Sequence, residues 1–490
     1  MAMTSLLGLG ALRRLPVESR PLVRPGTVPA GIVHIGLGAF FRAHQAVYTE
    51  AALAASGGDW GIVGVAPRTA SVVDALSSQD QLYSVTSLSA NDAQTRVVGA
   101  LAASHVAALD PARVVALLAD PAIRVVTLTV TEKGYLLDPA TGRLLSDPAL
   151  DADLSGDRPP TTVPGMLVQG LLARARADAG PIAIVSCDNL PANGRRVQGM
   201  LDAAFARAGH DDAWVRANVR CPGTMVDRIV PASTEATRSL AAAALGVVDQ
   251  VALSGEPYMQ WVIEDDFPGG RPAWEAAGAV LTDDAGPWER LKLRSLNGVH
   301  SAMAYLGALA GRSTIAEAYE MPGLADAMRR FIAEDVAPSF TPPAGVSVVS
   351  YGASVLSRFA NPAIAHRTTQ IAMDGSQKLP QRVLETISDR RAAGATPRWG
   401  ALVVAAWMRY ARGVADDGHA LTLDDPLADS IRAAIAAAPA TPDGLAGALF
   451  GLTAVFPAAL AEDEVVRALV VEWLTEFEKH GVETTLAGLS

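Results

Sequence analysis

The hydrophobic and polar positions along the chain follow two different patterns, and the change between them lies near residue 285. Before it, short apolar runs rich in β-branched residues alternate with longer alanine-rich stretches such as AHQAVYTEAALAAS (43–56). The four clearest runs are GIVHIGLGAF (31–40), GDWGIVGVAP (58–67), IRVVTLTVTE (123–132) and GPIAIVSCDN (180–189). Strands that alternate with helices in this way predict a mainly parallel sheet covered on both faces.

Beyond about Trp288 the apolar residues recur at helical spacing, and no strand is expected there. The amphipathic, helix-length segments are 292–309, 315–337, 401–415 and 463–481. A chain of 490 residues is also too long for a single hydrophobic core. We therefore expect two domains: an α/β domain over 1–285 that begins with a proline-containing N-terminal arm, and an all-helical domain over 286–490.

The composition indicates which classes of partner are disfavoured and in which cellular compartment the protein is expected. A net charge of −11 argues against nucleic acid or an anionic membrane as the main partner. The two cysteines, Cys187 and Cys221, are too few for a disulfide framework or a thiolate metal site. No run reaches the roughly 20 apolar residues needed to span a bilayer, and the N-terminal apolar patch precedes its arginines, unlike a secretion signal. These features predict a soluble cytoplasmic protein.

The first apolar run ends in the turn Gly36-Leu37-Gly38, directly before the first helix. Such a turn lets a pyrophosphate approach the main chain at the start of a helix. Phe41 stands where the usual fingerprint has a third glycine, and glycines after strands are often only turns. Gly36, Gly38 and the neighbouring Phe40 are the candidate cofactor-binding residues of this turn.

The second strand ends in Ala66-Pro67-Arg68. An acidic residue is expected here when the ribose 2′-hydroxyl of NAD is bound in the common way, whereas Arg68 would tolerate the 2′-phosphate of NADP. The choice between NAD and NADP therefore stays open on these residues alone.

Polar residues elsewhere suggest a substrate site. Asn189 follows the fourth apolar run and would lie at the carboxyl edge of the sheet, where it could donate to an oxyanion, although an Asx turn would also explain it. Asp227 stands between apolar residues. The segment 366–382 brings together His366, Arg367, Lys378 and Arg382. Such a cluster could bind a carboxylate or several hydroxyls, and its alternative reading is a solvated basic loop.

The segment 289–300 carries the strongest chemistry. On an α-helix that turns about 100° per residue, Glu289, Asn297 and His300 share one sector with Lys292. Polar groups turned inward cost desolvation, which predicts a buried polar network or a catalytic site. Lys292 could act as a general base if burial beside a positive nicotinamide ring lowers its pKa from about 10.4. The alternative is a Lys–Glu pair near the start of the helix.

These motifs together resemble the long-chain mannitol dehydrogenase family of polyol and sugar-acid dehydrogenases. The resemblance runs from GIVHIGLGAFFRAHQAVYTE through LTVTEKGY, SCDN, TMVDRIVPA and QWVIEDDF to KLRSLNGVH and RFANPAIAHRTTQIAMDGSQKLPQR. Its K-x4-N-x2-H signature corresponds here to Lys292, Asn297 and His300. The resemblance implies a Rossmann-like, mainly parallel sheet domain followed by a mostly α-helical domain, with the active site at the boundary of the two. It also implies a monomeric, metal-independent enzyme that uses NAD.

The same resemblance implies roles for individual residues. Lys292 would be the general acid/base, Asn189 and Asn297 the pair that polarises the oxygen, and Glu289 the gate for proton exchange. The remaining substrate contacts would come from His300, Asp227 and Lys378.

The family pattern also bears on the substrate. Members that oxidise neutral polyols tend to show D-T-T-x-R-V before D-G-S, whereas this chain has His366-Arg367-Thr368-Thr369-Gln370-Ile371. This variant resembles the branch that reduces D-fructuronate to D-mannonate, and a His-Arg pair suits a carboxylate. The alternatives are a D-mannitol/D-fructose dehydrogenase, a Schiff-base enzyme that uses Lys292, and a nucleotide-binding sugar sensor without turnover.

Overall fold

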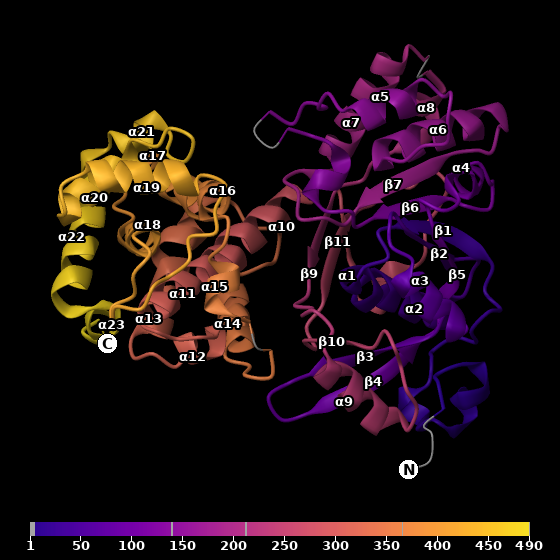
Figure 1. The fold of residues 1–490 in the computed structure, drawn as a ribbon, viewed down its shortest axis with the longest axis horizontal. Helices are drawn as coiled ribbons and strands as arrows, with labels where there is room; N and C mark the ends of the chain where they lie inside the picture. The colour runs from indigo at the N-terminus through magenta and orange to yellow at the C-terminus, as the bar shows by residue number, and fades with distance from the viewer. Residues whose placement is uncertain (1–4, 139–140, 211–212, 365, 490) are drawn as a thin grey trace. The chain divides into compact units, whose positions relative to one another are not determined.

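The computed structural model describes residues 5–138, 141–210, 213–364 and 366–489, and the chain forms two compact units, Met1–Gly286 and Pro287–Ser490 (Figure 1). In the described part of the chain, no helix is long and apolar enough to cross a membrane.

Unit 1 is built around a parallel six-stranded sheet with the strand order β5-β2-β1-β6-β7-β8. The strands are β1 (Ala30–Ile35), β2 (Gly61–Ala66), β5 (Leu101–Val106), β6 (Val125–Leu128), β7 (Ile182–Ser186) and β8 (Val219–Arg220). The chain runs outward from β1 in one direction and then returns to continue from β6 in the other. The carboxyl ends of β1 and β6 are therefore the switch point, where open sheets of this kind bind ligands.

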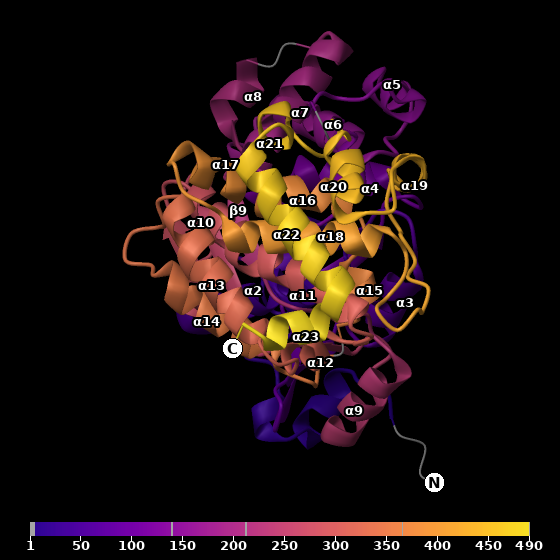
Figure 2. The same ribbon diagram turned by 90° about the vertical axis from the view of Figure 1, so that its left-hand side faces the viewer.

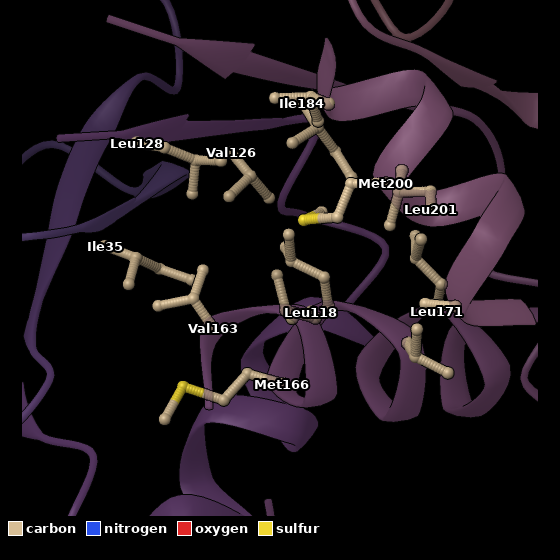
Figure 3. Packing of buried hydrophobic residues seen from close by; sticks show 14 of the residues in the cluster. Ile35, Leu118, Val126, Leu128, Val163, Met166, Leu171, Ile184, Met200 and Leu201 are labelled. Atoms are coloured by element: carbon tan, nitrogen blue, oxygen red, sulfur yellow. The ribbon is translucent and has the colours of Figure 1, made fainter. Parts of the chain in front are cut away.

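Helices cover both faces of this sheet because its central strands are apolar on both sides. On one face, side chains of β1, β6 and β7 pack against α4 (Pro111–Leu118), α6 (Val163–Arg176) and α7 (Asn193–Ala208). Figure 3 shows this packing between Ile35, Val126, Leu128 and Ile184 of the strands and Leu118, Val163, Met166, Leu171, Met200 and Leu201 of the helices. The second core includes buried residues of α1 (Ala39–Ala43), α2 (Gln45–Ser56) and α3 (Ser71–Ser78). The predicted parallel sheet is confirmed.

Two small sheets complete unit 1, and neither follows from the apolar pattern. One has the order β10-β3-β4 and the other β12-β11-β9. Their strands are β3 (Tyr83–Leu88), β4 (Ala93–Val98), β9 (Thr224–Asp227), β10 (Leu253–Gly255), β11 (Gln260–Glu264) and β12 (Val280–Thr282). The remaining helices are η1 (Leu9–Arg14), η2 (Val17–Ser19), η3 (Glu132–Tyr135), α5 (Pro148–Leu154), α8 (Ala213–Asn218), α9 (Glu235–Leu245) and η4 (Trp274–Ala277).

Unit 2 is helical, and its described residues contain no β-strand. Its centre is α11 (Gly298–Leu309), whose residues are all buried, together with α18 (Arg398–Ala411). The long helix α22 (Glu464–His480) packs against α18 (Figure 2). Between them, Trp473 Nε1 donates to Arg398 O at 3.0 Å. The other α-helices are α10 (Gly286–Leu291), α12 (Ile315–Tyr319), α13 (Leu324–Arg330), α14 (Val348–Phe359), α15 (Thr368–Ile371), α16 (Gly375–Leu379), α17 (Glu385–Ala392), α19 (Ala428–Ala437), α20 (Pro442–Phe450), α21 (Ala458–Ala461) and α23 (Val482–Ala487).

Three short segments of unit 2 are π-helical. They are η5 (Lys292–Asn297), η6 (Phe331–Val336) and η8 (Pro380–Leu384), and a 3₁₀ turn, η7 (Ala337–Ser339), follows η6. η5 joins α10 to α11 in one continuous helix, so the predicted helix over 292–309 is present but is not α-helical at its start. Hydrophobic spacing could not reveal this difference, because the residues of α11 after the turn are all buried and leave no polar face that would mark the shift.

Candidate active site

The glycine turn after β1 is fixed by its neighbours. Gly36 has φ +109°, and a Cβ there would lie 2.0 Å from Thr129 O, so only glycine fits. Gly36 O accepts a hydrogen bond from Thr129 Oγ1 at 2.7 Å. Gly38 is the N-cap residue before α1 and is exposed, and a Cβ there would meet only Gly36 O at 3.8 Å. The main chain at Gly38 is therefore open to a ligand.

The missing third glycine has a structural explanation. Phe41 is buried and stacks on His34 of β1, with the ring centroids 3.4 Å apart. Burial lowers the pKa of His34 to about 3, and its Nε2 lies 2.9 Å from Gly36 O. Helix and strand thus meet through two stacked rings instead of through a glycine. Phe40, the other aromatic residue of α1, is half-buried and stacks on His44 at 5.0 Å.

The carboxyl end of β2 carries an exposed Arg68 after Pro67. No carboxylate follows the strand at the place where a ribose 2′-hydroxyl is usually bound.

Asp188 holds the carboxyl ends of β6 and β7 together. It accepts hydrogen bonds from the N–H groups of Val130 at 2.9 Å and Thr131 at 3.1 Å, and from Tyr135 Oη at 2.7 Å. Burial raises the pKa of this carboxyl group, although the hydrogen bonds act in the opposite direction. The next residue, Asn189, is exposed at this edge of the sheet. Asp227 ends β9 in the small sheet β12-β11-β9 and is buried.

In unit 2, Lys292 and Asn297 occupy the two ends of η5. Lys292 is only 8% exposed, and Oδ1 of Asn297 is buried without a hydrogen-bond partner. Glu289 lies in the first turn of α10 and is half-buried.

His300 lies between aromatic neighbours on α11. Its ring stacks on Phe359 of α14 at 4.6 Å between centroids and on His366 at 5.4 Å. Its Nε2 is buried and has no hydrogen-bond partner. A buried ring nitrogen left unpaired is costly, which suits a group that binds a substrate hydroxyl.

The charges around His300 are positive. Burial lowers the pKa of His300 well below 6.5, and the next causes are the positive charges of His366, Arg382, Lys378 and Arg358. The imidazole is therefore neutral at physiological pH. Burial also lowers the pKa of His366.

Part of the predicted basic segment 366–382 lies near His300. His366 O accepts from Ile315 N at 2.9 Å, which ties the segment to α12. Lys378 Nζ donates to Met373 O at 2.6 Å and lies 3.8 Å from Asp374 Oδ2. Arg367, by contrast, is exposed.

Two further residues beside His300, Arg358 and Phe359, are not among the predicted site residues. Both lie in the RFANPAIAHRTT segment next to His366, and that proximity was the available signal. Among the described residues, no group of three or more His, Cys, Asp and Glu side chains gathers as metal ligands would.

Two family models match most of the chain. The Rossmann domain of mannitol dehydrogenase matches residues 30–276, and the mannitol dehydrogenase C-terminal domain matches residues 284–475. The chain belongs to the mannitol dehydrogenase family. It is an oxidoreductase of this family, which comprises polyol and sugar-acid dehydrogenases.

Relatives in this family have names that point to more than one substrate. The oxidoreductase YeiQ of Escherichia coli strain K12 is 42% identical over 458 residues, which cover 92% of this chain and 93% of the relative. The D-mannonate oxidoreductase of the same strain is 41% identical over 419 residues, covering 84% and 86%. A solved structure of Pseudomonas fluorescens mannitol 2-dehydrogenase, in a ternary complex with NAD and D-mannitol, is 34% identical, covers 99% of both chains and has a TM-score of 0.85.

Proposed function

We propose that this chain is an NAD(H)-dependent, metal-independent dehydrogenase that interconverts D-mannonate and D-fructuronate. The observation that carries the proposal is the set of cations whose charges act on His300, namely Lys378, Arg382 and Arg358, together with the unpaired Nε2 of that histidine. A carboxylate on the sugar would complement this charge, whereas a neutral polyol would not. The 41% identity to a D-mannonate oxidoreductase supports the same substrate.

The residues of unit 1 fit the cofactor. The exposed main chain at Gly38, with open space around it, accommodates a pyrophosphate at the switch point of the sheet. NAD supplies the hydride acceptor for the oxidation. The solved relative that contains NAD supports this cofactor. Arg68, in place of an acidic residue after β2, makes NADP(H) the cofactor to test beside it.

The proton chemistry is assigned to unit 2. Lys292 takes the hydroxyl proton during oxidation and returns it during reduction, and half-buried Glu289 exchanges that proton with water. Asn297 donates to the substrate oxygen as its charge develops, and Asn189 is the second candidate donor. The neutral His300 binds a neighbouring hydroxyl through Nε2. Asp227, His366, Arg367 and Lys378 are the further substrate-binding candidates.

A second candidate is the D-mannitol/D-fructose reaction, because the solved relative binds D-mannitol. A nucleotide-binding sugar sensor is the alternative of another class. It would bind NADH without turnover, and the complete Lys–Asn–His set argues against it.

The test is NADH oxidation at neutral pH with D-fructuronate and D-fructose in parallel, repeated with NADPH and with EDTA. Turnover of fructuronate far above that of fructose, unchanged by EDTA, is the expected result. Preference for fructose would replace the proposal with the mannitol reaction. Tight NADH binding without turnover of either sugar would favour the sensor.

A further inference from the structure

The π-helical turn η5 changes which residues share one side of the helix. In a regular α-helix, residues five apart are separated by about 140° around the axis, so Lys292 and Asn297 would lie at the two edges of a wide sector. In a π turn the hydrogen bonds run from residue i to residue i+5, as the bond from Gly298 N to Leu293 O does. Residues five apart then follow each other after about one turn. The extra residue therefore places Lys292 and Asn297 on the same side.

A π turn is rare and needs contacts from outside the helix to persist. At its C-terminal end, Gly298 lies against the main chain of η8, where a Cβ would be 2.8 Å from Arg382 O. Arg382 Nη1 also lies 3.4 Å from Asn297 O and donates to Ser301 Oγ at 3.0 Å. These contacts fix the exit of the turn into α11.

Arg294 holds the middle of the turn. Its side chain is only 4% exposed, and Nη1 donates to Ser339 Oγ at 2.8 Å and to Asp389 Oδ2 at 2.6 Å. Nη2 donates to Glu385 Oε2 at 3.3 Å. Ser339 ends η7, and both carboxylates belong to α17. One planar guanidinium thus ties the π turn to two other segments, which a lysine could not do with the same geometry.

We infer that Arg294 is a positioning residue that keeps η5 in the register presenting Lys292 and Asn297 together to the substrate. This inference rests on the proposed function, which assigns the proton transfer to Lys292. Without the guanidinium, the turn can relax towards an α-helix, and Lys292 then rotates relative to Asn297. A displacement of about 1 Å at a reacting group can cost on the order of 10²-fold in rate, so kcat should fall while KM changes little.

Three variants test this role. Arg294→Met removes the guanidinium, and Asp389→Asn removes the charge of a partner whose side chain is 49% exposed. Arg290→Met, an exposed arginine one turn upstream, is the matched control. We expect kcat to fall about 30- to 100-fold in Arg294→Met and about fivefold in Asp389→Asn, with each KM within about threefold of wild type. Arg290→Met should match wild type.

A second readout needs no substrate. The chain has four lysines, Lys133, Lys292, Lys378 and Lys479, so competitive acetylation followed by mass spectrometry resolves each of them. At a fixed pH, the acetylation rate of buried Lys292 should rise towards that of exposed Lys479 in Arg294→Met and stay unchanged in Arg290→Met. A general loss of folding would instead raise the acetylation of partly buried Lys378 as well and lower the melting temperature.

Wild-type kcat in both Arg294→Met and Asp389→Asn, or lost kcat with an unchanged Lys292 acetylation rate, would overturn the inference. If Arg294→Met does not fold, the kcat and the Lys292 acetylation of Asp389→Asn provide the test. If the wild-type protein turns over neither sugar, the proposed substrate fails, and the acetylation rate still tests Arg294.

Discussion

His300 and Phe359 form a stacked pair, with ring centroids 4.6 Å apart and 20° between the ring planes. The pair joins α11 to α14 and fixes the plane of the imidazole, and hence the direction of the unpaired Nε2. The histidine proposed to bind the substrate is thereby oriented by an apolar neighbour.

Phe359→Leu should raise KM for the sugar about threefold to tenfold, because an aromatic pair contributes about 0.5–1.5 kcal/mol beyond its buried area. Phe450→Leu is the control, since Phe450 packs on Phe456 at 4.9 Å in the same unit. Both variants should lose a similar amount of melting temperature, and only Phe359→Leu should change KM. Equal kinetic effects in the two would refute a specific role of the stack.

Lys292→Met should lower kcat by about 10²–10⁴-fold, the usual contribution of a general acid/base. NADH binding, followed by fluorescence titration, should stay within about twofold of wild type, because the cofactor is assigned to unit 1. Lys479→Met, at an exposed position of α22, is the control. Lys292→Met retaining more than about a tenth of wild-type kcat would show that another group moves the proton.

Arg358→Gln should distinguish a carboxylate site from a hydroxyl site. A charge-assisted hydrogen bond contributes about 1.5–3 kcal/mol, so KM for D-fructuronate should rise at least tenfold. Turnover of D-fructose should hardly change. Arg432→Gln, an exposed arginine paired with Asp429 on α19, should leave both substrates unaffected. Equal losses on the two sugars would mean that Arg358 contributes to structure, and not to recognition of the acid.

Gly298→Ala should lower both stability and kcat, because the added Cβ would lie 2.8 Å from Arg382 O. Overpacking of this kind costs about 1–3 kcal/mol. Gly199→Ala in α7 has no atom within 4 Å of the added Cβ and should instead stabilise the fold by about 0.4–1 kcal/mol. Thermal melts of the two variants provide the comparison, and similar shifts in both would exclude a close contact at Gly298.

The buried carboxyl group of Glu50 should make the free energy of unfolding decrease as the pH rises. The carboxyl group is buried on α2 and accepts from Gly99 N at 2.6 Å, and burial raises its pKa from 4.5 to about 7. Between these two values the folded state holds a proton that the unfolded state has lost, so the free energy of unfolding decreases with pH in this window. The full effect above pH 7 is on the order of 3 kcal/mol. Glu50→Gln should therefore lose less melting temperature than wild type between about pH 5 and pH 8, and parallel curves would contradict the assignment.

The main sheet could be predicted because β1, β2, β6 and β7 are buried on both faces and so appear as continuous apolar runs. The β3–β4 hairpin could not be predicted, because polar residues alternate along β4 and the turn between the strands is polar as well. Such a segment has the composition of a loop.

For the candidate site, the sequence indicates which polar residues take part but not how they are arranged in space. Lys292 and His300 stand out because polar residues interrupt an apolar helix. The π turn between them could not be recognised, because the residues that follow it are buried on every side. Arg358 and Phe359 were missed because their role depends on α14 packing beside α11, a tertiary contact that no local pattern encodes.

The two glycines after β1 are constrained by different forces, which matters for how this segment can diverge. Position 36 is closed to every other residue by its own backbone angle and by Thr129 O, so a change there fails before any ligand is involved. Position 38 tolerates a side chain in the fold, and a change there only occupies space that a bound phosphate would need. Natural selection for folding alone would preserve the first glycine, and only selection for cofactor use would preserve the second. If Gly38 binds the cofactor as proposed, a descendant that kept Gly36 and lost Gly38 would be a folded protein without its nucleotide.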